Sequence, residues 1–211
     1  MNTYIDLSQD IIDDMPVYPG DDKVKLYQDN YLEKDNYNSC RLEIGMHAGT
    51  HIDTPMHLSK RQTLISEIPL EKFSGKGCLL DVRNEKVIAF KQEYVDVVEE
   101  NDIVLLFTNH SYKYGTEEYY TEHPVIDKDL AEFFVEKNIK MLGMDLPSPD
   151  NYPFEMHKIL FKNDILIIEN LTNLLQLAGL NNFNVIAFPL KIKAEASMAR
   201  VVAIKSIGNF R

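Results

Sequence analysis

The sequence predicts an α/β fold in which strands outnumber helices by roughly two to one. One segment, residues 103–108 (Ile-Val-Leu-Leu-Phe-Thr), forms a continuous apolar run, which is typical of a strand buried on both faces of a sheet. Helical spacing of apolar residues occurs in fewer segments, of which residues 127–138 are the clearest. The length of 211 residues suits a single domain that spans residues 1–211.

Composition and charge narrow the possible functions. The net charge of −11 argues against a nucleic-acid partner and against an anionic membrane surface. No apolar stretch approaches the ~20 residues of a membrane span, and the N-terminus has no basic region that would indicate a signal peptide. Two cysteines, Cys40 and Cys78, are too few for a disulfide framework, so we expect a reduced cytoplasmic location.

The N-terminal part of the chain is expected to consist of strands and loops. Residues 4–7 suit a short strand, and residues 15–21 form a fixed loop because they contain two prolines and a glycine. Residues 24–31 and 39–46 predict two strands joined by a turn at residues 34–36.

The middle of the chain contains the most apolar segments. Residues 78–82 predict a buried strand in which Cys78 is a core residue rather than a nucleophile. Residues 90–100 place phenylalanine, tyrosine and valine at helical intervals and predict a helix. The strand at residues 103–108 follows, and His110 beyond it is expected in a solvated loop.

The C-terminal half alternates helices and strands. Residues 127–138 predict a helix with Asp127 as its N-cap, and residues 139–145 predict a strand. Residues 154–162 suit a short helix that carries His157. The remaining expected elements are a strand at 165–168, which Glu169 follows, a short helix at 171–177, and strands at 185–190 and 201–207.

Residues 47–57 read His-Ala-Gly-Thr-His-Ile-Asp-Thr-Pro-Met-His and hold three of the six histidines. A straight strand would place His47 and Asp53 on one face but roughly 20 Å apart, and a helix would turn Asp53 away from the histidines. We therefore expect the segment to enter as a strand and then to curl at Gly49 and Pro55. The residue types favour a metal site over a histidine-rich surface loop or core histidines.

These residues resemble the signature H-x-G-T-H-x-D-x-P-x-H of the cyclase family, metal-dependent hydrolases that include bacterial kynurenine formamidases and isatin hydrolases. Every fixed position of that signature is filled. Residues 16–21 and 143–148 resemble two further family stretches, Pro-x-Tyr-Pro-Gly-Asp and Gly-x-Asp-x-Pro-Ser. The resemblance implies a swivelling β/β/α domain with a mixed sheet and few helices.

The resemblance also implies a metal centre. His47, His51 and Asp53 would bind one divalent ion, and Asp53 would bridge to a second ion held by His157 and Glu169. The chain would thus carry one or two ions, and these nitrogen and oxygen ligands suit Zn²⁺ or Mn²⁺.

Two further residues receive roles from the resemblance. His57 lies beyond the ligands and is expected to act as general acid and base, with a role as fourth ligand as the alternative. Tyr18 is expected to line the substrate pocket. The residues considered for contact with an aromatic substrate are Tyr18, Phe73, Tyr112, Tyr152 and Phe154.

The implied function is hydrolysis of amide-type C–N bonds, in an arylformamide or a cyclic amide, by a metal-activated hydroxide. The alternative is a non-enzymatic metal- or small-ligand-binding protein on the same scaffold. Leu146 stands where the kynurenine formamidases usually have threonine, which leaves the substrate open. The expected partners are a small-molecule substrate and a second copy of the chain, in a homodimer or a higher homo-oligomer.

Overall fold

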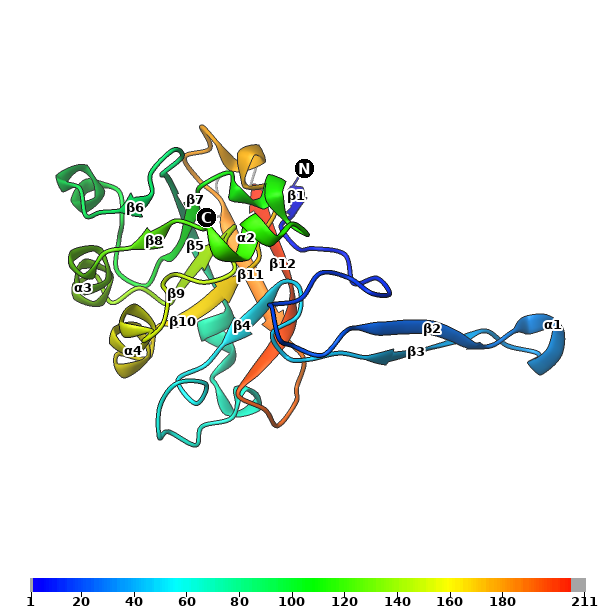
Figure 1. Ribbon diagram of the computed structural model, residues 1–211. Coiled ribbons are helices and arrows are strands. Elements are labelled where there is room, and N and C mark those ends of the chain that lie inside the picture. The colour runs from blue at the N-terminus through cyan, green and yellow to red at the C-terminus, as the bar shows by residue number, and fades with distance from the viewer. Residues whose placement is uncertain (1, 206–211) are drawn as a thin grey trace.

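The computed structural model describes residues 2–205 and contains many strands and few helices (Figure 1). The strands are β1 (Thr3–Asp6), β2 (Lys25–Asn30), β3 (Ser39–Glu43), β4 (His51–Asp53), β5 (Ser74–Asp81), β6 (Val87–Ile88), β7 (Ile103–Phe107), β8 (Val125–Ile126), β9 (Met141–Met144), β10 (Leu166–Glu169), β11 (Asn184–Pro189) and β12 (Ala196–Lys205). The α-helices are α1 (Leu32–Asp35), α2 (Glu117–Thr121), α3 (Lys128–Glu136) and α4 (Glu155–Lys162). The 3₁₀ helices are η1 (Ile65–Glu67), η2 (Leu70–Phe73), η3 (Gln92–Asp96), η4 (His110–Lys113) and η5 (Leu174–Leu177).

The main sheet of the described residues has eight strands in the order β1-β12-β11-β5-β7-β9-β10-β4. Strands β5, β7, β9 and β10 run parallel, and the other pairings are antiparallel, so the sheet is mixed. The long strand β12 also pairs with β4, which closes the sheet into a barrel-like arrangement. The predicted α/β class with a mixed sheet and few helices is confirmed.

The central strands bury both of their faces, as the continuous apolar run at residues 103–108 predicts. Ile103, Leu105 and Phe107 pack in one hydrophobic cluster, which also contains residues of β4, β10, β11 and β12. Val104 and Leu106 point to the other face, where they pack in a second cluster with residues of α3 and α4. This alternation follows from the two-residue period of a strand.

Gly143 lies where the side chains around β9 pack closely. A Cβ atom there would lie 2.6 Å from Cδ2 of Leu105 and 3.0 Å from Cδ1 of Leu171. A side chain on Gly143 would therefore force the side chains of Leu105 and Leu171 to shift in a closely packed core.

A two-stranded arm, residues 25–43, projects from the body on the side away from α3 and α4 (Figure 1). Strand β2 pairs with β3 in an antiparallel ladder, and α1 connects them at the tip. The two expected strands at 24–31 and 39–46 are thus confirmed, and the expected turn between them is a single helical turn.

Of the two helices predicted at residues 127–138 and 90–100, the first is confirmed and the second is not. The N-cap of α3 is Asp127, whose side chain accepts a hydrogen bond from the backbone N–H of Leu130. The helix expected at residues 90–100 is wrong, because only the 3₁₀ helix η3 forms there; β-branched valines and an aspartate give this segment a low helix propensity.

The two C-terminal expectations also need correction. The helix expected at 171–177 is reduced to η5, since Asn173 adopts a positive φ of 60° immediately before it. The strand expected at 201–207 begins five residues earlier, at Ala196, where its first residues pair with β4. Positions 206 and 207 lie outside the described residues. Among the helices of residues 2–205, none is long and apolar enough to cross a membrane.

Candidate metal centre and pocket

The histidine-rich stretch bends in the way its residue types require. Gly49 has a positive φ of 65°, and the chain then enters β4, which carries His51 and Asp53. His47 precedes this bend, which folds its ring back over the strand. The bend expected at Gly49 is confirmed, and its positive φ is one that favours glycine.

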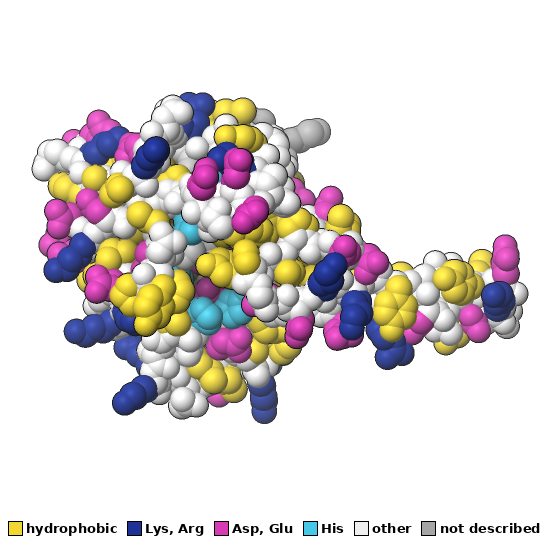
Figure 2. All heavy atoms as spheres, in the orientation of Figure 1, with side chains coloured by type: hydrophobic (Ala, Val, Ile, Leu, Met, Phe, Trp, Pro, Cys, Tyr) yellow, Lys and Arg dark blue, Asp and Glu magenta, His cyan; other side chains and the backbone are white. Residues whose placement is uncertain are grey.

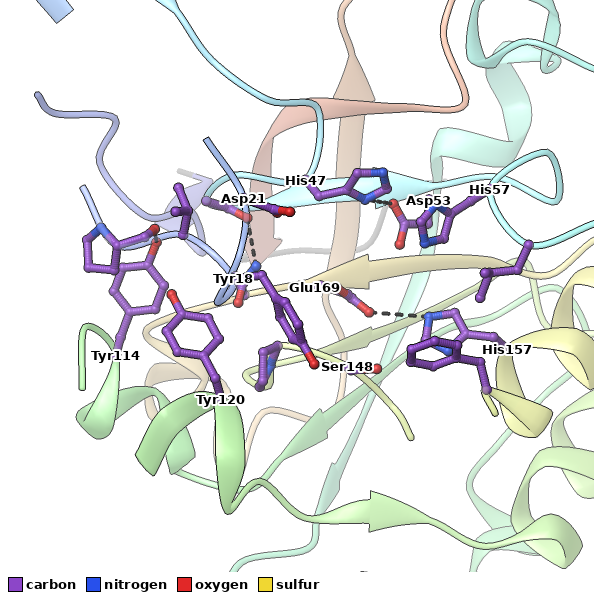
Figure 3. A pocket seen from close by; sticks show the side chains of 17 residues that line it. Tyr18, Asp21, His47, Asp53, His57, Tyr114, Tyr120, Ser148, His157 and Glu169 are labelled. Carbon is purple, nitrogen blue, oxygen red and sulfur yellow. Dashed lines mark hydrogen bonds and ion pairs between the residues drawn. The ribbon is translucent and has the colours of Figure 1, made fainter. Parts of the chain in front are cut away.

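The bend brings the first three predicted ligands together. Nδ1 of His47 lies 2.9 Å from Oδ1 of Asp53 (Figure 3). Nε2 of His51 lies 3.4 Å from the same oxygen. One ligand atom from each of the three residues lies within 4.8 Å of the others. This spacing allows a single ion to contact all three atoms.

A second group of three shares Asp53. Glu169 is the last residue of β10, which pairs with β4, and His157 lies on α4. Nε2 of His157 lies 3.4 Å from Oε1 of Glu169, and the ligand atoms of Asp53, His157 and Glu169 lie within 4.8 Å of one another. The structure therefore brings all five predicted ligands into two adjacent groups with one carboxylate in common.

The donor set fits divalent cations. Nε2 of His51 and Oδ1 of Asp53 are buried and have no hydrogen-bond partner among the described residues. Burial alone would lower the pKa of His51, but Asp53 and Glu169 outweigh it and raise that pKa well above its usual value. The carboxylates thus attract positive charge strongly, which is the property that a cation site requires.

The histidines are held in defined orientations. Nδ1 of His51 lies 2.9 Å from the carbonyl oxygen of Gly49, which leaves Nε2 facing the carboxylates. The amide of Asn170 donates to the same carbonyl at 2.9 Å and fixes the bend from the other side. Burial would also lower the pKa of His157, but Asp150 and Glu169 raise it to about 9.

His57 lies beside the two groups and belongs to neither of them. Its ring centroid is 4.3 Å from that of His47 and 6.4 Å from that of His157. Burial lowers its pKa, so the ring is neutral at pH 7 and can accept a proton.

A pocket of about 260 Å³ opens beside the histidines (Figures 2 and 3). Tyr18 and Phe154 line it, as the sequence suggested, and Tyr114, Tyr120 and Leu58 complete its apolar wall. The rings of Tyr18 and Tyr120 meet edge to face at 5.8 Å. The walls are therefore suited to the faces and edges of an aromatic ring.

Four residues that the sequence analysis considered do not behave as expected. Phe73 is buried in the barrel core, while Tyr112 and Tyr152 are strongly exposed and lie outside the pocket lining. His110 is not in a solvated loop: it is buried in η4, and its Nε2 lies 3.1 Å from the carbonyl oxygen of Tyr119.

The site also includes four residues for which no sequence pattern predicted a role: Tyr114, Tyr120, Asp150 and Asn170. Asn170 directly follows Glu169 and has a positive φ of 58°, a conformation in which asparagine is enriched. An asparagine after a strand could have been recognised as such a turn residue. The other three offer no comparable sequence signal, because they reach the site through tertiary packing.

The sequence of this chain is similar to those of known proteins. The family model named Cyclase matches residues 5–151. A kynurenine formamidase of Bacillus cereus is 30% identical over 205 residues, which cover 94% of this chain and 96% of that protein.

Solved structures resemble the whole chain. A potential metal-dependent hydrolase with cyclase activity superposes with a TM-score of 0.79 at 25% identity, over 99% of this chain and 100% of that one. An isatin hydrolase bound to the product analogue thioisatinate superposes with a TM-score of 0.86 at 17% identity, over 97% of this chain and 92% of that one, a likeness of fold.

Proposed function

Because the chain belongs to the cyclase family, we propose that it is a metal-dependent hydrolase of amide-type C–N bonds, with an arylformamide or a cyclic aryl amide as substrate. The observation that carries this proposal is the pair of ligand groups that share Asp53 beside an aromatic pocket. One relative is named a kynurenine formamidase and one structural neighbour an isatin hydrolase, and both names support hydrolysis of an amide C–N bond.

In this proposal His47, His51 and Asp53 hold one divalent ion, and Asp53, His157 and Glu169 hold a second. Zn²⁺ and Mn²⁺ both suit the nitrogen and oxygen donors. Such ions act as Lewis acids, which lower the pKa of water from 15.7 to about 7 and polarise a carbonyl oxygen.

His57 is the proposed general base and acid. Its neutral ring lies next to His47, at the mouth of the ligand groups and in the wall of the pocket. It can accept the proton of the attacking water and return it to the leaving nitrogen. The alternative role as a fourth ligand is disfavoured because neither ligand group includes His57.

The pocket supports a small aromatic substrate. Its volume of about 260 Å³ is at the low end for ligand sites, which suits one or two fused rings with a short substituent. Tyr18 is proposed to contact the aromatic ring of the substrate. Its own ring is held edge to face against that of Tyr120. Leu146, where the sequence departs from the kynurenine formamidases, lies in the hydrophobic core and does not line the pocket.

A hydrolysis screen tests the proposal. Protein loaded with Zn²⁺ or with Mn²⁺ would be assayed against N-formylated aryl amines, isatin-like lactams and aryl lactones. We expect hydrolysis of at least one of the C–N substrates, loss of that activity after chelation, and recovery on addition of metal. Undiminished hydrolysis by protein that elemental analysis proves free of metal would contradict it. Metal binding with no hydrolysis of any substrate would favour the alternative, a non-enzymatic binding protein.

A further inference from the structure

Asp150 is a buried carboxylate that contacts a proposed ligand without belonging to either ligand group. Its Oδ1 lies 2.5 Å from Nδ1 of His157. Its Oδ2 accepts hydrogen bonds from the backbone N–H groups of Met156 at 2.7 Å and His157 at 3.4 Å, in the first turn of α4. One carboxylate thus fixes the start of the helix and the ring that the helix carries.

This contact determines which nitrogen of His157 is free. A carboxylate can only accept, so Nδ1 of His157 carries the proton and donates it to Asp150. Nε2 is then the nitrogen that remains to bind an ion, and it faces Glu169, 3.4 Å away. A carboxylate that orients a ligating histidine in this way also raises the basicity of the nitrogen that faces the ion.

The other ligand group has a different support. Nδ1 of His51 faces the carbonyl oxygen of Gly49 at 2.9 Å, so its partner is neutral. The two groups therefore share Asp53 but differ in the charge behind their buried histidines. A buried carboxylate, that of Asp150, stands behind His157, whereas in the first group a carboxylate stands only behind the half-buried His47, where Oε1 of the more exposed Glu195 lies 3.3 Å from Nε2.

The carboxylate behind His157 affects the net charge around the two proposed ions. Two divalent ions facing Asp53, Glu169 and one hydroxide would leave an excess of about one positive charge. Asp150 supplies one further negative charge, directly behind His157. On the basis of the proposed metal centre, we propose that Asp150 is the positioning residue that sets the affinity of the second ion, the one held by Asp53, His157 and Glu169.

The hydrogen bond itself can be tested on metal-free protein. An Nδ1–H that donates to a buried carboxylate gives a strongly downfield imidazole proton in the NMR spectrum, and Asp150→Ala should abolish it. His157→Ala identifies the signal. A spectrum of Asp150→Ala identical to that of the wild type would overturn the proposal.

The effect on metal affinity is measured by competition titration with Zn²⁺ of the wild type, Asp150→Asn and Asp150→Ala. We expect the second ion to bind about 10–100-fold more weakly in both variants and the first ion to bind within about twofold of the wild type. Asp145→Asn is the matched control: Asp145 is also buried, but its carboxylate accepts from the backbone N–H and hydroxyl of Thr108 rather than from a histidine.

A purely structural role for Asp150 predicts a different pattern. Damage to α4 would lower the melting temperature of the metal-free variants and weaken both ions together, and this result would overturn the proposal, as would unchanged affinity for the second ion. Wild-type protein that takes up a single ion under saturating Zn²⁺ would overturn it as well. Neither readout uses hydrolysis, so protein that binds two ions in the predicted way but cleaves no substrate would contradict only the proposed function.

Discussion

Every residue of strand β7 is buried, whereas the paired strands β2 and β3 contain no fully buried residue (Figure 1). In both regions the backbone N–H and C=O groups form hydrogen bonds through strand pairing. In the barrel, the side chains form two hydrophobic clusters that hold the strands together. In the arm, exposed ion pairs such as Lys25–Glu43 and Arg41–Asp29 join the strands, and pairs of this kind contribute little to stability.

The arm nevertheless carries a row of exposed apolar side chains: Tyr27, Tyr31, Leu32, Tyr37 and Leu42. An isolated two-stranded hairpin is only marginally stable in water, so we expect an arm of this composition to gain order by packing against another surface. The barrel is therefore stabilised by its own core and holds the candidate site, whereas the arm presents apolar side chains to solvent. We propose that the chain forms a homodimer and that the second subunit packs against the arm.

The largest expected effect is on the chemistry of the barrel. His57→Ala should lower kcat/KM by about 10²–10⁴-fold, because a general acid–base group contributes that much, while the metal content and the oligomeric mass stay unchanged. Kinetics and elemental analysis on the same sample would measure both. Loss of one ion per chain in the variant would instead identify His57 as a ligand.

Glu169→Gln should remove the second ion. We expect a fall from about two ions per chain to about one under saturating metal, since the variant loses a charged oxygen ligand and keeps the group of His47, His51 and Asp53. The stoichiometry is measured by elemental analysis after gel filtration. A value of one ion in both proteins would show that His157 and Glu169 serve another purpose.

Changes in the arm should affect association and leave the barrel intact. The double variant Leu32→Glu, Tyr37→Glu should convert a dimer of twice 24.4 kDa into a monomer of 24.4 kDa by light scattering. Its metal content should not change. Val87→Glu is the control, because Val87 is similarly exposed, at 56% against 60% for Leu32, but lies on the body. Monomeric wild type at micromolar concentration, or a dimeric double variant, would refute the role of the arm.

The smallest effect is a difference in reactivity between the two cysteines. Cys40 lies exposed on the arm and Cys78 lies buried in β5, where burial raises the pKa of its thiol to about 11. At pH 8 only about one Cys78 thiol in 10³ is ionised, and reactivity should rise with pH until the pKa is passed. Iodoacetamide labelling of the Leu32→Glu, Tyr37→Glu double variant, followed by mass spectrometry, should therefore show that Cys40 is modified before Cys78. Equal rates at both cysteines would show that the core opens readily.

Local patterns predicted much of the fold and the types of the site residues. The continuous apolar run of β7, the N-cap Asp127 and the bend at Gly49 all depend on neighbours in the sequence, and all agree with the structure. The motif resemblance selected five ligand candidates that the structure brings together. Their spacing alone could not do this, because His157 and Glu169 reach Asp53 only through the pairing of β4 with β10 and the packing of α4.

The wrong predictions for His110 and for the start of β12 also arise from contacts that the local sequence does not indicate. His110 appeared to be a solvated loop residue because it follows a strand, but Tyr119 stacks on its ring at 5.3 Å and covers it. The early start of β12 at Ala196 depends on β4, which is distant in sequence. Residues 194–197 alone contain nothing that would indicate this pairing.

The closure of the barrel by β12 has a consequence for biosynthesis. Strand β4 has two neighbours, β10 and β12, and Asp53 pairs with Ile167 on one side and Ala196 on the other. A ribosome adds about 5–20 residues per second, so Asp53 is made roughly 7–30 s before Ala196. The nascent chain lacks β10 for most of that interval and lacks β12 until its end. We therefore expect the proposed ligand groups to reach their final arrangement, and to take up metal, only after translation has passed the first residues of β12.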